Sequence, residues 1–507
     1  MIRNRVIILL LTALAVLSCK HERVLPDLDP DDPETPVQPA SRYATGQSFK
    51  STLLGTSIPY NILIPEHYAT EDAIYPVVYC FHGYNNDQNS WNGDSMRIQT
   101  EIESLERSGK IPPMIYVFPM GYNSYFVNRW NGSYPYMDMF VNEFVPWIDR
   151  MYRTIADKEH RAVVGYSMGA FGALATAMQH PETFSTCAAL SISMRTDEQY
   201  MTESQGAFDN QWGRIFGGEG NTGASRITEY YKSLCPLHQF TTDNIDKYSG
   251  VNYFITCGDN EKTLLYGNDD LHVMMLQNGY DHEYRVGDGG HSESYWRPAM
   301  REVLPWFKFL MDGRTDWEFN TYTIDVPEDC TFGENGEFLS QSYINAGMTQ
   351  GTALYLFHKG LDDAVVRDAE AIMQRSNNKK YVILPCDVTL KSPSEWVTQW
   401  EAAYTVTARQ AIALGEAGPA LIQDQGTFTY LYFENAKIEG TFSVSSSKKY
   451  FIGQCDQNEY SAGANALYKA CKEGGVDFEY RCRNHVNDAR EDLLMGIEYI
   501  KANLKGL

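Results

Sequence analysis

Basic residues are scarce in this chain of 507 residues: 42 Lys and Arg stand against 65 Asp and Glu, which gives a formal net charge of −23. A chain this acidic repels a phosphate backbone, so we expect no nucleic-acid partner. The sequence has no C-x-x-C pair and no His-Glu-x-x-His motif, so a zinc site lacks support. Its ten cysteines are widely scattered and predict no particular disulfide pairing. The apolar share of 43% is ordinary, and the length predicts two or three globular domains.

Long apolar runs are missing as well, with one exception near the N-terminus. Two arginines precede the run Val6–Val16, which is too short for a permanent membrane span and is typical of a secretory signal. The small residues before Cys19 resemble the lipobox of bacterial lipoproteins, whose cysteine is acylated; the alternative is an ordinary cleaved signal. Residues 20–40 are rich in Pro and Asp and predict an extended tether. We therefore expect residues 1–19 to be a lipoprotein signal peptide, and the protein to be exported and held at the bacterial cell envelope only by a lipid on Cys19.

Short β-rich runs alternate with helix-like segments over residues 41–313. This alternation predicts an α/β domain with a mostly parallel sheet, in which reactive groups gather at the carboxyl ends of the strands. The expected strands are 60–65, 76–81, 115–118, 162–164 and 253–257, and the expected helices include 137–150, 169–179 and 297–312.

The same alternation of strands and helices starts again in residues 314–507. Tyr253-Phe254-Ile255 recurs as Tyr450-Phe451-Ile452, each followed by Cys, Asn and Glu, and residues 279–285 recur as 475–481. The matching order and the near-constant offset indicate a duplicated α/β unit. We therefore predict a shortened second copy of the first domain.

Gly165-Tyr166-Ser167-Met168-Gly169 is a G-x-S-x-G motif. The motif alone is weak, but here it follows an expected strand and precedes an expected helix of small residues. That context predicts a nucleophile elbow, which projects the Ser167 hydroxyl above the sheet edge. It also places the Met168 N–H at a helix N-terminus, where an oxyanion would form.

A serine hydroxyl needs a base and an orienting acid to act as a nucleophile. In this architecture the chain order is serine, acid, histidine, and His291 fits because it follows a glycine-rich loop after an expected strand. The acid is expected after the strand that ends at Cys257, where Asp259 and Glu261 are both candidates that spacing does not separate. The second oxyanion donor is expected in the loop His82-Gly83-Tyr84, as the Tyr84 N–H.

These residues together resemble the esterase D-like branch of the α/β-hydrolases, and within it the feruloyl and acetylxylan esterases of carbohydrate esterase family one. The resemblance covers about residues 45–312 and rests on four motifs: Phe81-His82-Gly83, the Ser167 motif, Cys257-Gly258-x-Asn260-Glu261, and Gly289-Gly290-His291 followed by Trp296. It implies an α/β-hydrolase fold and no cofactor. The family acid, usually Asp, stands at the position of Glu261, so Glu261 is favoured and Asp259 remains the alternative.

The resemblance implies a serine esterase that cleaves ferulate or acetate from plant xylan through an acyl-enzyme. Trp91, Tyr125, Trp130 and Trp212 are the candidate substrate-binding aromatics, and residues 193–250 are expected to form an insertion over the site. Two alternatives remain: an esterase for siderophores or other small esters, and a non-catalytic glycan-binding lipoprotein. The oligomeric state stays open.

The second copy lacks a G-x-S-x-G motif. Its nearest likeness, Gly415-Glu416-Ala417-Gly418, has no hydroxyl at the nucleophile position, although Glu459 and His485 are retained. Ser392 and Glu395 have the spacing of a capping box, which predicts a helix continuing to about Leu414. We expect this copy to be catalytically inactive.

Overall fold

The computed structural model describes residues 39–261, 263–313, 331–332, 338–339, 351–360, 381–403, 406–426 and 428–483. The predicted signal peptide, Cys19, nearly all of the tether and His485 lie outside these residues. None of the helices within them is long and apolar enough to cross a membrane.

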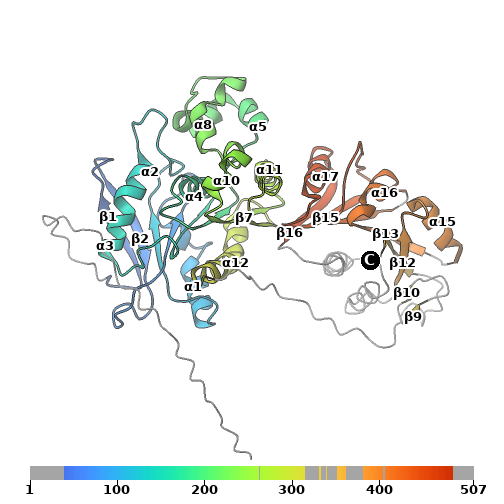
Figure 1. Ribbon diagram of the computed structural model, residues 1–507, viewed down its shortest axis with the longest axis horizontal. Coiled ribbons are helices and arrows are strands. Elements are labelled where there is room, and N and C mark those ends of the chain that lie inside the picture. The colour runs from blue at the N-terminus through green and yellow to red at the C-terminus, as the bar shows by residue number, and fades with distance from the viewer. Residues whose placement is uncertain are drawn as a thin grey trace, which may run out of the picture.

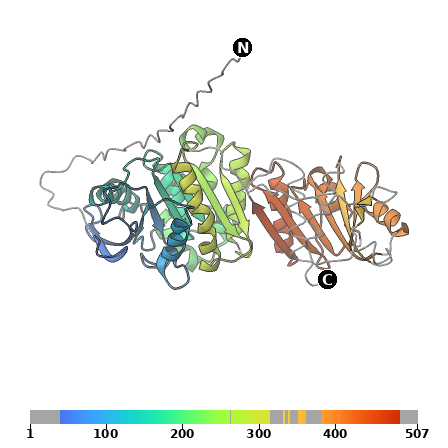
Figure 2. The same cartoon turned by 90° about the horizontal axis from the view of Figure 1, so that it is seen from below.

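The described residues form one 16-stranded sheet, which Figure 2 shows running through the whole length of the molecule. Its strand order is β1-β2-β4-β3-β5-β6-β7-β8-β16-β15-β14-β13-β11-β12-β10-β9. The strands are β1 Tyr43–Lys50, β2 Ser57–Leu63, β3 Val77–Phe81, β4 Ile115–Pro119, β5 Arg161–Tyr166, β6 Thr186–Leu190, β7 Asn252–Gly258, β8 Glu283–Gly287, β9 Thr331–Phe332, β10 Phe338–Leu339, β11 Gly351–His358, β12 Tyr381–Asp387, β13 Val406–Leu414, β14 Tyr430–Glu434, β15 Lys449–Cys455 and β16 Asp477–Arg483.

The helices connect these strands. They are α1 Ile98–Arg107, α2 Tyr136–Met139, α3 Val145–Met151, α4 Met168–Gln179, α5 Asp197–Thr202, α6 Gln205–Phe208, α7 Arg214–Phe216, α8 Glu229–Leu234, α9 Pro236–Gln239, α10 Ile245–Tyr248, α11 Leu264–Gln277, α12 Glu293–Met311, α15 Pro393–Ala403, α16 Gly418–Gln423 and α17 Ser461–Glu473. The π-helical segment Phe140–Phe144 joins α2 to α3.

The first half is a three-layer α/β unit. Strands β4-β3-β5-β6-β7-β8 are parallel, and β2 and β1 extend the sheet in antiparallel fashion. Neighbouring residues of a strand face opposite sides: Val163 joins the core under α3, α4 and α11, while Ala162 and Val164 join the separate core under α1 and α12. Figure 1 shows these two helix layers on either side of the sheet. The predicted α/β-hydrolase fold with a mostly parallel sheet is confirmed.

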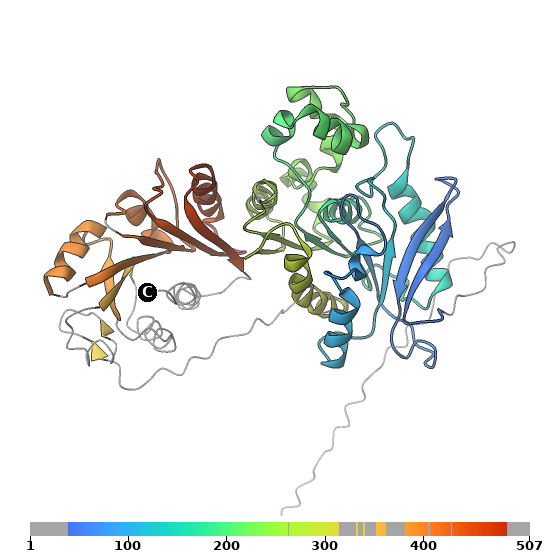
Figure 3. The ribbon, with the colours of Figure 1, turned by 180° about the vertical axis from the view of Figure 1, so that it is seen from behind.

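The second half repeats the strand order of the first. Strands β16-β15-β14-β13-β11-β12 are parallel and correspond one by one to β8-β7-β6-β5-β3-β4, and β10 and β9 take the places of β2 and β1. The two halves therefore meet through equivalent strands, β8 and β16, and Figure 3 shows this contact at the centre of the molecule.

One sequence prediction in this half is wrong. The expected helix from Ser392 to about Leu414 ends at Ala403, and Val406–Leu414 is the strand β13. The capping box itself forms, because Ser392 and Glu395 exchange backbone-to-side-chain hydrogen bonds. Strand β13 lies between β11 and β14, with Ala411 to Ala413 fully buried. Burial in the sheet centre overrides the local preference for helix.

The junction between the halves contains buried polar groups. Strand β16 pairs with β8 in antiparallel fashion at Cys482 and Val286. Beside this pair, the Tyr480 hydroxyl donates to Asp269 Oδ1 over 2.6 Å. Asp269 is fully buried, and no partner among the described residues lies within hydrogen-bond distance of its Oδ2. Burial raises the pKa of this carboxyl to about 7, although the hydrogen bond from Tyr480 opposes the shift.

We predict that Asp269→Asn stabilises the protein at alkaline pH. The folded-state pKa of Asp269 lies above its ordinary value of 3.8, so its contribution to stability is complete below about pH 4 and is lost as the pH rises through 7. Asparagine has the same size, accepts from Tyr480 and never ionises. The free energy of unfolding at pH 8 should therefore rise by about 1–3 kcal/mol, and the gain should vanish towards pH 4. Urea unfolding measures this, with exposed Asp246→Asn as control; equal stabilities at pH 8 would contradict it.

Candidate active site

Ser167 occupies a strained turn between β5 and α4. Its backbone has φ 57° and ψ −120°, a conformation that non-glycine residues adopt only when the surroundings impose it. The flanking glycines permit the turn: a Cβ on Gly165 would lie 2.1 Å from the Gly169 carbonyl oxygen, and one on Gly169 would lie 2.3 Å from the Phe81 carbonyl oxygen. The turn therefore has the geometry of a nucleophile elbow.

A chain of hydrogen bonds links three residues that the sequence predicted. His291 Nε2 lies 2.8 Å from Ser167 Oγ, and His291 Nδ1 lies 2.7 Å from Glu261 Oε2. Glu261 is fully buried, whereas about a third of the His291 side chain is exposed. This arrangement can remove the Ser167 proton and hold the resulting imidazolium beside a carboxylate.

Glu261 is held in place by neighbours that the sequence analysis did not identify as site residues. Its Oε1 accepts hydrogen bonds from the Ser191 hydroxyl and from the Gly258 N–H. Ser191 in turn accepts from Trp296 Nε1 over 2.8 Å, and the Trp296 ring packs edge-on against His291. Ser191 belongs to no sequence motif, so nothing in the sequence singles it out. In the structure it follows β6 directly and has a positive φ of 54°.

The alternative acid, Asp259, faces away from the imidazole. Its carboxylate pairs with Arg481 and accepts from the Gly289 N–H. The structure thus places Glu261 on His291 and gives Asp259 a different set of partners.

The loop and the helix that carry the expected oxyanion donors both pass close to Ser167. A Cβ on Gly83 would be 3.5 Å from Ser167 Cβ, so the loop that carries Tyr84 runs next to this serine. Met168 opens the 12-residue helix α4, where backbone N–H groups lack intrahelical partners. An acyl oxygen bound between the loop and the helix would meet the positive end of the α4 dipole.

His82 fixes the loop that carries Tyr84. Its Nε2 accepts from the Gly121 N–H over 2.9 Å, so the proton is on Nδ1, which donates to the Gly83 carbonyl over 2.8 Å. Burial lowers the pKa of His82 to about 4, and the ring is therefore neutral at neutral pH. The oxyanion loop is thus held by an uncharged imidazole.

The insertion after β6 contacts this loop, since the Tyr84 hydroxyl donates to the Asn210 carbonyl over 3.3 Å. Figure 1 shows its helices, among them α5, α8 and α10, on the side of the sheet that carries α4 and α11.

Three of the four predicted substrate-binding aromatics are core residues. Trp91 and Tyr125 have no exposed surface, and Trp212 is 3% exposed. Trp91 packs against Tyr166, Tyr125 bonds Ser193 and Gln211, and Trp212 lies under Arg195. These placements correct the sequence expectation, which could not separate a cleft aromatic from a packed one. Trp130 is 52% exposed and remains accessible to a ligand.

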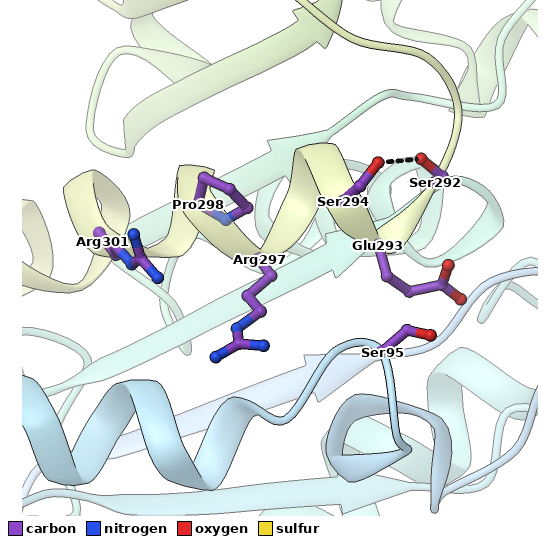
Figure 4. A pocket seen from close by; sticks show the side chains of 7 residues that line it. All are labelled: Ser95, Ser292, Glu293, Ser294, Arg297, Pro298 and Arg301. Atoms are coloured by element: carbon purple, nitrogen blue, oxygen red, sulfur yellow. Dashed lines mark hydrogen bonds between the residues drawn. The ribbon is translucent and has the colours of Figure 1, made fainter.

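A pocket of about 540 Å³, with mostly polar residues in its lining, begins at Ser292 directly after His291 (Figure 4). Glu293 and Arg297 extend from the start of α12 towards the segment that carries Ser95 (Figure 4). Arg297 and Arg301 both pair with Glu101, which neutralises part of their charge. The lining consists of Ser95, Ser292, Glu293, Ser294, Arg297, Pro298 and Arg301.

Metal and thiol chemistry receive no support from the described part of the chain. No three His, Cys, Asp or Glu side chains gather there as metal ligands would. The eight cysteines described are all buried free thiols, and burial raises the pKa of those beside the site, such as Cys80 and Cys257.

The second half has no hydroxyl where the first has Ser167. Strands β3 and β5 correspond to β11 and β13, and their last paired residues are Phe81 with Gly165 and Phe357 with Ala413. Ser167 and Gly415 each come two residues later, so Gly415 takes the place of Ser167, and the sequence comparison, which put Ala417 there, is corrected. Gly415 also has a positive φ, 48°, which matches the elbow. Glu459, the counterpart of Glu261 in sequence, is exposed.

Comparisons with known proteins agree with this site. Residues 51–307, about half of the chain, match the family model described as putative esterase. An esterase of Mycobacterium tuberculosis is 28% identical over 286 residues, which are 52% of this chain and 57% of that protein. An endo-1,4-beta-xylanase/feruloyl esterase of Xylanibacter ruminicola is 30% identical over 146 residues, 27% of this chain and 20% of that protein. The chain thus spans little more than half of the length of the first relative and a fifth of the second.

Solved structures include similar folds. A ferulic acid esterase superposes with a TM-score of 0.45 at 25% identity, covering 53% of this chain and 98% of the other. The ferulic acid esterase of Anaeromyces mucronatus, in complex with ferulic acid, gives a TM-score of 0.39 at 18% identity, covering 53% and 92%.

Fold and site together define an α/β-hydrolase fold in which a serine, a histidine and a carboxylate are linked by hydrogen bonds. The chain belongs to the putative esterase family, through residues 51–307.

Proposed function

We propose that this protein is a serine esterase that removes feruloyl or acetyl groups from an acylated plant polysaccharide or oligosaccharide through an acyl-enzyme. The observation that carries the proposal is the continuous chain of hydrogen bonds from Glu261 through His291 to Ser167. The similarity to the Xylanibacter ruminicola endo-1,4-beta-xylanase/feruloyl esterase supports the choice of substrate.

In the first step Ser167 Oγ attacks the ester carbonyl carbon while His291 Nε2 takes its proton. The Tyr84 and Met168 N–H groups stabilise the oxyanion of the tetrahedral intermediate. His291 then gives the proton to the departing alcohol, and the acyl group remains on Ser167. Glu261 keeps the proton-bearing Nδ1 of His291 in place throughout.

In the second step water replaces the alcohol. His291 takes a proton from water, which attacks the acyl carbon, and the free acid leaves as Ser167 regains its proton. No cofactor takes part in this scheme.

The pocket that begins at Ser292, the residue after His291, supports a sugar as the leaving alcohol. Ser95, Ser292 and Ser294 bring hydroxyl groups to its lining. Hydroxyl groups both donate and accept, which suits a polyol better than an apolar alcohol. Exposed Trp130 offers a ring face for stacking.

The remaining parts of the chain have supporting roles in this proposal. The second half is non-catalytic because a glycine stands at its nucleophile position. Residues 1–19 direct export, and a lipid on Cys19 anchors the enzyme at the cell envelope, where a polymer too large to enter the cell is accessible. Mass spectrometry of the mature N-terminus tests the anchor.

The test compares methyl ferulate, 4-nitrophenyl acetate and feruloylated arabinoxylan as substrates for the chain without residues 1–19. We expect ferulate release that is at least about tenfold faster, as kcat/KM, from arabinoxylan oligosaccharide than from methyl ferulate, since a bound sugar contributes roughly 1.4 kcal/mol or more. Acetate release alone would keep the esterase and reject the feruloyl substrate. Retention of the folded protein by xylan without hydrolysis of any ester would favour a binding protein.

A further inference from the structure

Two reciprocal ion pairs cross the junction between the halves. Arg285 on β8 pairs with Asp456 after β15, and Arg481 on β16 pairs with Asp259 after β7. Since β8 and β16, and likewise β7 and β15, are equivalent strands, each half offers the same arginine to the same aspartate of the other. This reciprocity is what a two-fold symmetric interface produces. Figures 1 and 3 show β16 beside the strands that carry the site.

The pair at Asp259 is buried. Asp259 is 4% exposed, and the exposed fraction of the Arg481 side chain is 13%. Burial raises the pKa of Asp259, and the charge of Arg481 opposes that shift. Breaking a buried ion pair by removing one partner is strongly destabilising, so Arg481 of the second half holds the Asp259 carboxylate in place.

Asp259 ties together the two loops that carry the partners of Ser167. Its Oδ1 accepts from the Gly289 N–H over 3.2 Å, and its own N–H donates to the Gly287 carbonyl over 2.9 Å. Gly289 precedes His291 by two residues, and Asp259 precedes Glu261 by two. Movement of the Asp259 carboxylate would therefore shift the two loops relative to each other.

We propose that Arg481, from the catalytically inactive second half, is a positioning residue for the active site of the first. It holds Asp259, which sets the distance between the Glu261 loop and the His291 loop. The degenerate copy thus acts as a built-in partner subunit that completes the site. The proposal depends only on the hydrolytic site and is independent of the acyl group or glycan.

The test is Arg481→Met in the full mature chain, because methionine keeps much of the apolar stem and removes the charge. With 4-nitrophenyl acetate we expect kcat to fall roughly tenfold to a hundredfold, as for a misplaced catalytic group, while KM changes less than about twofold. Arg481→Lys should restore part of kcat. The low-field proton resonance of His291 Nδ1, which needs no substrate, should weaken or shift in Arg481→Met.

Lys469→Met is the matched control. Lys469 also crosses the junction, bonding Asp270 over 2.6 Å, yet this pair does not contact the loops of Glu261 or His291. Lys469→Met should lose less thermal stability than Arg481→Met, because the Lys469–Asp270 pair is about a third exposed, and only Arg481→Met should lose kcat and the resonance. Equal kcat in the two variants would overturn the proposal.

Asp259→Asn tests the same connection from the other side and serves if Arg481→Met does not fold. It should reproduce the loss of kcat, and the double variant should lose no more than the larger single loss, because both act through one contact. A normal rate for Asp259→Asn would overturn the proposal, as would additive losses. A wild-type protein inactive on every ester would reject the proposed function instead, and the resonance would still decide the role of Arg481.

Discussion

Replacement of Ser167 by alanine is expected to lower kcat for 4-nitrophenyl acetate by about 10⁴–10⁶-fold. The reason is that no other hydroxyl occupies the end of the hydrogen-bond chain from Glu261 through His291. The oxyanion site remains, so a small rate above that of water is expected to survive. Stopped-flow kinetics should also lose the initial burst that reports the acyl-enzyme.

The matched control is Ser51→Ala, which removes another buried hydroxyl of the first half. Ser51 bonds Glu143 over 2.6 Å at the far edge of the sheet, so its loss should leave kcat within about twofold. A fluorophosphonate probe should add its phosphonyl group to wild-type Ser167 with release of fluoride, and should not label Ser167→Ala. Appreciable hydrolysis by Ser167→Ala would reject both the nucleophile and the inactivity of the second half.

Glu261→Gln is expected to lower kcat by about 10⁴-fold. Glutamine has the same shape, but its amide cannot stabilise the imidazolium that forms when His291 takes a proton. It can also present an N–H to Nδ1, which would force the proton onto Nε2 and leave no base facing Ser167. Steady-state kinetics at pH 7–8 measure the loss, and the near-ultraviolet circular dichroism should be unchanged.

Asp259→Asn is the natural comparison because it removes the other candidate acid two residues away. Its loss of kcat should stay within about a hundredfold, since Asp259 only positions loops. If Asp259→Asn were the more damaged variant, Glu261 would lose its assignment as the orienting acid. Trp296→Phe should lower kcat by less than Glu261→Gln does. It removes only the N–H that donates to Ser191, which in turn donates to Glu261.

Local features of the fold and site were readable from the sequence because they depend on neighbouring residues. The elbow at Ser167 requires small residues on both sides, and Gly165 and Gly169 stand where a Cβ would clash with backbone. Strand-to-helix alternation predicted the parallel sheet, and β3, β4 and β5 appear close to the predicted positions. The order of Ser167, an acid and His291 follows from the fold once the elbow is recognised.

Contacts between distant segments decided the rest. Asp259 and Glu261 follow the same strand, and only the folded loops aim Glu261 at His291 and Asp259 at Arg481, more than two hundred residues away in the chain. Trp91 and Trp212 are buried, and the sequence around each of them does not predict which other elements will cover it. Strand β13 forms because a place between β11 and β14 outweighs helix propensity.

The sequence by itself therefore determined the fold class and the turn at Ser167, since the strand, the turn and the helix that form it are contiguous in the chain. Only the tertiary structure decided which carboxylate bonds the histidine, which of the candidate aromatics are exposed, and how the second half meets the first. These depend on the direction of side chains across loops and strands, and that direction is set by packing over the whole molecule.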